Sequence, residues 1–219
     1  MSSSPGSPAG GEAAQYGRLR TLLRKAFIDM ECVLGDWEEA SAQGAQVLHA
    51  LVNAGERLRD FTAAEGKLGV LSQVPGAEDA LRTRLIRSME RLHRALQPAM
   101  AALATACDKA EKIVDDAVHG ALELQHGCEP DGLWEGEYPG QPSIAEMQEW
   151  LQDWQHALRR ELGLRELLMR DAGSEEGLNR ALDLWDARIM LDAERVRARL
   201  EAVKVHVVAS MHPRAAFPA

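Results

Sequence analysis

Two short segments space acidic and imidazole side chains as metal-binding helices do. Glu90 and His93 form an E-x-x-H pair, and Asp153 and His156 repeat that spacing with an aspartate. In helical bundles such pairs hold iron or manganese when further carboxylates face the interior. Here the neighbouring apolar residues, rather than the pairs, occupy the expected core positions. The sequence therefore favours two solvated polar pairs over a metal site.

The remaining candidates for chemistry are weaker. His119, His126 and Cys128 lie close in sequence and could bind zinc, but no second ligand pair with matching spacing follows. Phosphate-binding glycine motifs and the G-x-S-x-G nucleophile motif do not occur in the sequence. A catalytic triad assembled from residues far apart in the chain would not be recognised from the sequence alone. We expect no enzymatic activity, no metal and no cofactor.

Composition bounds the class of protein. The chain has 219 residues and a formal net charge of -9. Because Lys and Arg must neutralise phosphates for nucleic acid to bind, we expect no direct nucleic-acid binding. Aromatic residues amount to only 5%, and Ala and Leu are abundant, which is typical of long helices. The sequence predicts an all-α fold.

The expected location follows from cysteines and hydropathy. Cys32, Cys107 and Cys128 are an odd number without a C-x-x-C pair, which suits a reducing compartment. The first residues lack the features of a signal peptide, and no uncharged run approaches the ~18 apolar residues of a membrane helix. We expect a soluble protein of the cytoplasm and nucleus that does not contact membranes.

Two long apolar stripes dominate the chain. Apolar residues recur every three or four positions from Leu19 to Phe61 and again from Leu81 to Leu124. A segment with several glycines and a proline, residues 66–76, separates the stripes and should form a loop. Two helices joined in this way predict a long antiparallel hairpin that resembles a coiled coil.

Glycine and proline mark special places on these helices. Gly44 and Gly55 lie on or beside the first stripe, where the missing Cβ lets a partner helix come close. Pro98 falls inside the second stripe and removes a backbone donor. It predicts a kink or a helix break near Gln97, the latter giving two shorter helices end to end.

A third helix has a defined start. Ser143 and Glu146 form a capping box directly after an acidic segment that is rich in Gly and Pro. Short helices should follow it, so the fold expected is an elongated bundle. We divide the chain into a disordered tail (1–14), the helical hairpin (15–126), an acidic hinge (127–141), a C-terminal helical segment (142–209) and a loose tail (210–219).

The tryptophans separate into two groups. Trp37, Trp154 and Trp185 lie at helical positions that suit burial in a core. Trp150 lies at the edge of the inner face of the third helix. It is either a partly covered core residue or an interface anchor, because partly exposed tryptophans are frequent at binding hot spots.

Arginines form two basic flanks. We interpret each flank either as a solvated face paired with nearby acids or as a docking patch for an acidic protein or an RNA backbone. One flank lies on the second predicted helix and consists of Arg82, Arg84, Arg87, Arg91 and Arg94. The other lies on the third predicted helix and consists of Arg159, Arg160, Arg165 and Arg170.

One block of sequence resembles a known family. Residues 142–153, PSIAEMQEWLQD, resemble the P-S-x-A-[ED]-M-x-E-W-L-Q-D signature of the AIRIM proteins. Shorter similarities follow in the family's order and spacing, so that the resemblance covers roughly residues 19–186. The hinge and the chain beyond about residue 188 differ from the family. The shorter elements are 34–40 with Trp37, 81–85, 159–168 and 181–186 with Trp185.

AIRIM proteins are small helical ribosome-maturation factors that partner Afg-type AAA ATPases. The resemblance implies a non-enzymatic adaptor subunit which, with a helical companion resembling CINP, helps release shuttling factors from pre-60S particles in the cytoplasm. It also implies a role in replication-linked protein turnover. Met147, Trp150, Leu151 and Asp153 occupy signature positions, and Trp150 and Leu151 are the expected partner contacts.

Two other hypotheses stay open at this level. The two stripes alone would also suit a structural coiled-coil subunit of a cytoskeletal or tethering complex. The Glu90 and His93 pair would suit a metalloenzyme built on a helical bundle.

Overall fold

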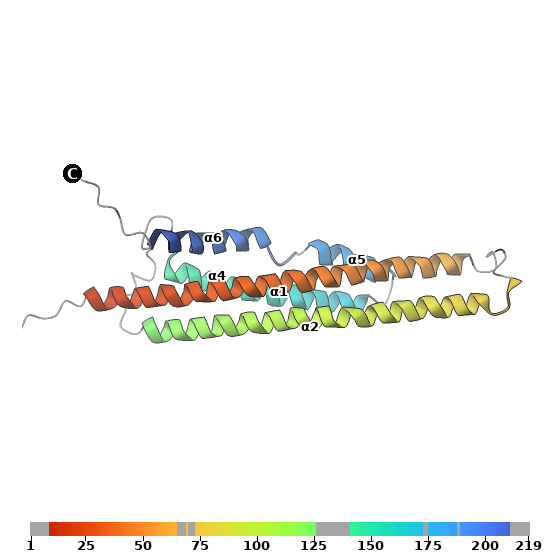
Figure 1. The fold of residues 1–219 in the computed structure, drawn as a ribbon, viewed down its shortest axis with the longest axis horizontal. Helices are drawn as coiled ribbons and strands as arrows, with labels where there is room; N and C mark the ends of the chain where they lie inside the picture. Colours follow the sequence, from red (N-terminus) through yellow and green to blue (C-terminus); the bar gives the residue numbers. More distant parts are fainter. Residues whose placement is uncertain are drawn as a thin grey trace, which may run out of the picture. The chain divides into compact units, whose positions relative to one another are not determined.

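A computed structural model describes residues 9–64, 69, 73–125, 141–172, 175–187 and 189–210. These residues form helices and their connections, and no strand occurs among them. The predicted all-α class is therefore confirmed. The helices are α1 (Ala9–Ala63), α2 (Ala77–Gln125), α4 (Ile144–Asp171), α5 (Glu175–Ala187) and α6 (Ala193–Ser210) (Figure 1).

Several predicted boundaries can be compared with these helices. The helix α1 already begins at Ala9, inside the segment 1–14 that we predicted to be a tail. The acidic hinge lies outside the described residues except for Gln141, which is buried. The helix α6 ends at Ser210, and the residues after it also lie outside the description. Disorder at the two ends of the chain stays a prediction.

The chain divides into two compact units that cut across the predicted sequence segments. Unit 1 consists of Met1–Leu34, Cys107–Arg159 and Leu191–Ala219, and unit 2 of Gly35–Ala106 and Arg160–Met190. Each unit contains one segment of α1, one of α2 and one of α4. The helix α6 completes unit 1, and α5 completes unit 2.

The core of unit 1 combines large side chains from α1 and α4 with small ones from α2. Because α2 contributes mostly alanines, its backbone approaches α1 closely, and a Cβ added at Gly120 would lie 3.0 Å from Leu22. Each fully buried leucine contributes about 1.5–3 kcal/mol. The core includes Leu19, Leu23, Phe27 and Met30 of α1, Ala110, Val114, Ala117 and Ala121 of α2, Leu151, Trp154 and Leu158 of α4, and Val196, Leu200 and Val203 of α6.

The start of α4 in unit 1 follows the predicted capping box. The backbone N–H of Ser143 donates to Glu146 Oε2 at 2.8 Å, and the backbone N–H of Glu146 donates to Ser143 Oγ at 3.1 Å. Two donors that the first turn leaves without helical partners are satisfied in this way. The guanidinium of the buried Arg20 donates to the carbonyl of Pro142 at 3.4 Å and ties α1 to the same place.

The core of unit 2 is built around tryptophan. Trp37 of α1 and Trp185 of α5 are each 1% exposed, as predicted, and Trp154 in unit 1 is 4% exposed. The other buried apolar side chains of unit 2 continue the helical stripes. They include Leu48, Leu51 and Ala54 of α1, Leu96, Ala99 and Leu103 of α2, Leu162 and Leu168 of α4, and Leu178 and Ala181 of α5.

The glycine prediction for α1 is confirmed at Gly44. The ring of Trp185 lies so close to Gly44 that an added Cβ would collide with ring atom Cζ2. The indole Nε1–H of Trp185 donates to the carbonyl of Ser41 at 3.0 Å, which fixes the ring there. At Gly55 an added Cβ would lie 3.9 Å from Leu178 and Met89, an ordinary contact. Close approach therefore depends on Gly44 and not on Gly55.

Of the kink or helix break predicted near Gln97, the break is wrong. The helix α2 runs from Ala77 to Gln125 with Pro98 inside it. Pro98 removes the hydrogen bond that the carbonyl of Arg94 would otherwise accept. Both residues are exposed, so water can replace the missing partner. The helix tolerates proline at this place because the loss falls on its solvated side.

Candidate functional site

The four signature residues occupy two faces of α4 in unit 1. Met147 and Leu151 are 2% and 0% exposed and belong to the core. Trp150 is half-buried, and Asp153 is exposed. Residues three or four apart share a helix face, so one face carries the core pair and the adjacent face carries the tryptophan and the carboxylate. Partner binding by these residues stays a prediction, and for the core pair it would require a rearranged unit.

Arg199 of α6 joins the two surface residues. Its guanidinium carbon lies 5.1 Å from the centroid of the Trp150 ring, and its Nη1 and Nη2 donate to Asp153 Oδ2 at 3.2 Å. The Arg199 side chain is 17% exposed and that of Asp153 is 50% exposed. Exposed cation–π contacts and ion pairs contribute about 0.5–1 kcal/mol each. This Trp150–Asp153–Arg199 cluster attaches α6 to α4 and leaves part of the tryptophan accessible.

Sequence reasoning found two members of this cluster and missed the third. Arg199 lies 46 residues from Asp153 in the chain, and it follows the point where the family resemblance ended. No spacing rule connects residues on two helices separated by that distance. Only the packing of α6 identifies Arg199.

Unit 2 holds a buried arginine that the sequence analysis misplaced. We placed Arg165 in a basic flank, but its side chain is 0% exposed. The guanidinium carbon lies 4.3 Å from the centroid of the Trp185 ring and 5.2 Å from that of Trp37. Its Nε donates to Glu161 Oε1 at 3.2 Å. The cause is helical spacing, because position 165 continues the buried stripe of α4 between Leu162 and Leu168.

The buried carboxylate beside Arg165 has a second role. Glu161 is also 0% exposed, and its Oε2 accepts a hydrogen bond from the backbone N–H of Met190 at 2.9 Å. One carboxylate thus joins α4 to the residues that follow α5. A desolvated cation–π contact contributes about 2 kcal/mol or more, which offsets part of the cost of burying Arg165. We call Trp37, Glu161, Arg165 and Trp185 the arginine–tryptophan core.

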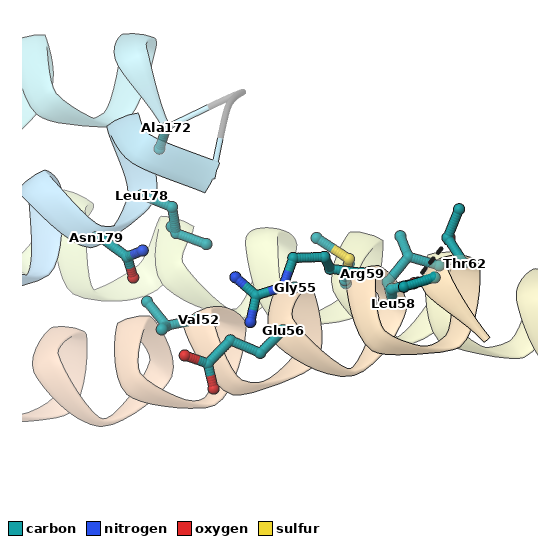
Figure 2. Close-up of a pocket in the computed structure, with 11 residues that line it drawn as sticks. Val52, Gly55, Glu56, Leu58, Arg59, Thr62, Ala172, Leu178 and Asn179 are labelled. Atoms are coloured by element: carbon teal, nitrogen blue, oxygen red, sulfur yellow. Dashed lines mark hydrogen bonds between the residues drawn. The ribbon is translucent and has the colours of Figure 1, made fainter.

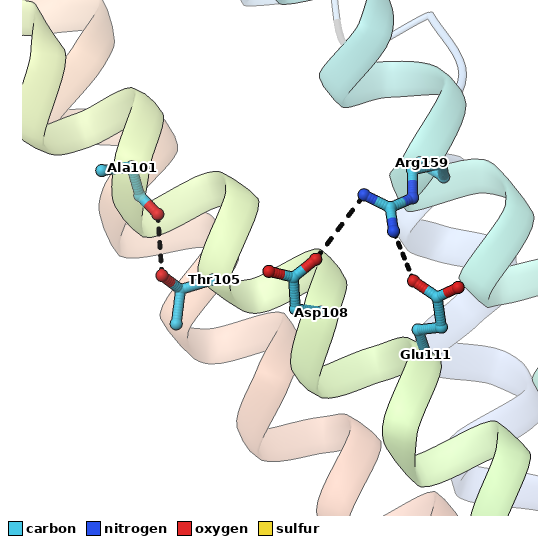
Figure 3. A network of polar contacts seen from close by, with 5 residues as sticks. All are labelled: Ala101, Thr105, Asp108, Glu111 and Arg159. Carbon is cyan, nitrogen blue, oxygen red and sulfur yellow. Dashed lines mark hydrogen bonds and ion pairs between the residues drawn. The ribbon is translucent and has the colours of Figure 1, made fainter.

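Arg159 pairs with nearby acids, as the first of our two interpretations of the basic flank predicted. It forms ion pairs with Glu111 and Asp108 of α2 in unit 1, the latter at 3.6 Å (Figure 3). The hydrogen bond with Glu111 raises the pKa of Arg159 above its ordinary value. The side chain is half-exposed, so each pair contributes less than about 1 kcal/mol. Along α2 in the same view, Thr105 donates to the carbonyl of Ala101 at 2.8 Å.

The basic flank of α2 in unit 2 differs from that of α4. Arg84, Arg87 and Arg91 are exposed and line a shallow hollow with a cavity volume of about 570 Å³. Within the described part of the chain, none of these three side chains forms an ion pair. These three therefore lie on a solvated face, and among the described residues they lack the acidic partners that one interpretation of the flank expected.

Unit 2 also contains an apolar groove. The groove has a cavity volume of about 530 Å³, and Leu58 and Gly55 of α1, Met89 of α2 and Leu178 of α5 line it (Figure 2). Charges of both signs lie at its edge, since Glu56 and Arg59 also line it. The groove therefore offers apolar contact area without a preference for one sign of charge.

The candidate metal ligands lie at surfaces. Glu90 and His93 are exposed, as are Asp153 and His156, and Asp153 pairs with Arg199. Among the residues that the structure describes, no three His, Cys, Asp or Glu side chains lie close enough to hold a metal ion. His126 and Cys128 lie outside the described residues, so the zinc hypothesis there is not addressed by the structure.

The fold and the surface define an all-α protein of two helical units, with exposed arginines on α2 and a half-buried tryptophan on α4. A family model described as CA109-like, ribosome biogenesis protein C1orf109-like, matches residues 18–208. The match covers most of the chain, so the chain belongs to this family of ribosome biogenesis proteins. It extends beyond residue 186, where the predicted resemblance ended, and includes Arg199. A search of curated proteins found no match. None of the described helices is long and apolar enough to span a membrane.

Proposed function

We propose that this chain is a non-enzymatic adaptor subunit of an AAA ATPase complex that matures the large ribosomal subunit in the cytoplasm. The observation that carries the proposal is the family match over residues 18–208, which includes both helical units. A ribosome biogenesis factor of this kind would act by holding proteins together. Its partners would be the ATPase subunits and a helical companion resembling CINP.

The charge of the chain supports an indirect route to the ribosome. At a formal net charge of -9, the chain as a whole repels a polyanion such as ribosomal RNA. We therefore propose that its partners contact pre-60S particles and that this subunit contacts the partners. The same complex would release and recycle shuttling factors, and a second role in replication-linked protein turnover would place part of the protein in the nucleus.

The Trp150–Asp153–Arg199 cluster is the proposed partner contact in unit 1. Tryptophan and arginine are enriched among hot-spot residues because they combine apolar area with directed polar contacts. Trp150 is half-buried, so a partner could cover the remainder of its ring without disturbing the core. Leu151, which is 0% exposed, would act on binding only through the stability of the unit.

Affinity purification of the tagged full-length protein from its native cells tests the proposal. We expect AAA ATPase subunits in amounts comparable to those of the tagged chain. Trp150→Ala should reduce the recovered ATPase by about tenfold, the effect of losing roughly 1.4 kcal/mol of binding free energy. Helicity by circular dichroism should change little.

Two further variants separate binding from folding. Glu149→Ala replaces an exposed neighbour of Trp150 and should leave recovery unchanged. Leu151→Ala should destabilise the protein by about 2–5 kcal/mol and lose partners through unfolding. The proposal fails if wild-type protein recovers no AAA ATPase. The assignment of the contact to Trp150 fails if Trp150→Ala recovers as much ATPase as Glu149→Ala.

A further inference from the structure

One face of α2 in unit 2 carries a row of arginines. Arg84, Arg87, Arg91 and Arg94 follow one another at intervals of three, four and three residues, and all four are exposed. With 3.6 residues per turn, this spacing keeps them on one face over about 15 Å of helix. We call these four residues the arginine row.

The row differs in its ion pairs from three other arginines of the chain. Arg159, Arg165 and Arg199 each pair with a carboxylate. In the row, Arg94 donates from Nε to the backbone carbonyl of Glu90 at 3.3 Å. The other three make no ion pair with any described residue. Like charges three and four residues apart destabilise a helix, so the spacing of the row lowers the stability of α2.

The residues beside the row are mostly small. The hollow that three of the arginines line also includes Asp79, Ala80 and Thr83, and Asp79 is the one acidic residue among them. Further along the same face the exposed residues are small, at Ala95, Pro98, Ala101 and Ala102. A solvated helix face usually carries long polar side chains. Small side chains instead allow another helix to approach α2 closely.

From the row and its surroundings we infer that this face of α2 binds an acidic helical segment of a partner protein. Glu or Asp side chains at intervals of three or four residues on the partner would meet the guanidinium groups in turn, as charge-assisted hydrogen bonds. The small residues would accept the partner backbone. Pairing with the partner's carboxylates then offsets the repulsion among the guanidinium groups of the row.

An RNA backbone fits the row less well. Four arginines neutralise only a few phosphates, whereas affinity for a duplex or strand grows with the number neutralised. A polyanion longer than about 15 Å would also run past the row onto a protein with 34 acidic and 25 basic residues. A short acidic segment can match the length of the row and so avoid the acidic surface beyond it.

The inference goes beyond the proposed function, because it places a binding surface in unit 2, whereas the signature residues lie in unit 1. Its test uses no ATPase. The probe is a fluorescein-labelled, alanine-based helical peptide of about 18 residues, or five turns, with glutamates at the spacing of the row. Fluorescence anisotropy with the full-length protein should show binding that weakens as salt is added.

Charge reversal provides the decisive comparison. The variant Arg84→Glu, Arg87→Glu, Arg91→Glu should bind the peptide at least about tenfold more weakly. The matched control, Arg18→Glu, Lys25→Glu, Lys112→Glu, changes the net charge equally at exposed residues of unit 1 and should bind as the wild type does. Circular dichroism of both variants checks that they fold.

Three outcomes would overturn the inference. Equal peptide affinity of the two variants would show that net charge alone matters. Tighter binding of single-stranded polyuridine than of the peptide, lost in the row variant, would assign the face to RNA. A second copy of the chain would be the occupant if light scattering showed dimers of the wild type and monomers of the row variant.

Discussion

At the scale of single residues, Arg165 is an unusual contributor to the stability of unit 2 because it is a charged side chain in the core. Its charge lies between the rings of Trp37 and Trp185 and beside the buried Glu161. Burying an ion pair gains little on balance, but removing one partner leaves the other charge without compensation. The arginine–tryptophan core therefore makes unit 2 sensitive to substitutions that look harmless in a basic flank.

Arg165→Ala should lower the free energy of unfolding by about 3–5 kcal/mol, because Glu161 then stays buried without its partner. Urea denaturation followed by circular dichroism measures the loss. Arg170→Ala, at the exposed end of α4, is the matched control and should change stability by less than about 0.5 kcal/mol. Equal effects of the two substitutions would show that Arg165 does not lie in the core.

Two glycines of α1 should respond in opposite directions. Gly44→Ala places a Cβ against the Trp185 ring and should destabilise the protein by about 1–3 kcal/mol. At Gly35 nothing lies within 4 Å of an added Cβ, so Gly35→Ala should stabilise by up to about 1 kcal/mol through helix propensity. Thermal unfolding of both variants checks this, and a stabilising Gly44→Ala would contradict the close contact.

At the scale of helices, polar contacts attach α6 to α4 and α1. Arg199 contacts both Trp150 and Asp153 of α4, and the amine of Lys204 donates to Glu31 of α1 at 2.7 Å. Val196, Leu200 and Val203 supply the buried apolar side chains of the helix. Partly exposed polar contacts of this kind hold a helix less firmly than a buried apolar core does.

Arg199→Ala should remove about 1–2 kcal/mol of this attachment and raise hydrogen exchange in α6. The helix α5 of unit 2 serves as the internal reference and should exchange as in the wild type. Arg195→Ala, at an exposed position of α6, should leave both helices unchanged. Unchanged exchange of α6 in Arg199→Ala would show that the cluster does not hold the helix.

Helix-level features were the most predictable part of the fold. Periodic apolar residues placed α1 and α2, and the capping box located the start of α4, because both signals are local in the sequence. The buried state of Arg165 could have been inferred from its position on the α4 stripe, but its charge argued against burial. The contact of Arg199 with Asp153 and the division of the chain into units depend on packing between distant segments, which spacing does not encode.

At the scale of the whole molecule, the chain combines an acidic net charge with one local row of arginines. Its charge of -9 is the reason for our proposal that the chain contacts proteins and not RNA. Unit 1 would supply the tryptophan cluster and unit 2 the arginine row. A subunit with two different surfaces can connect two partners, which is what an adaptor requires.

Native mass spectrometry of the assembly purified through the endogenous tagged chain tests this account most directly. We predict a heteromeric complex whose mass includes AAA ATPase subunits and a smaller helical companion. A complex that contains only copies of this chain would contradict the adaptor role and favour a structural coiled-coil subunit.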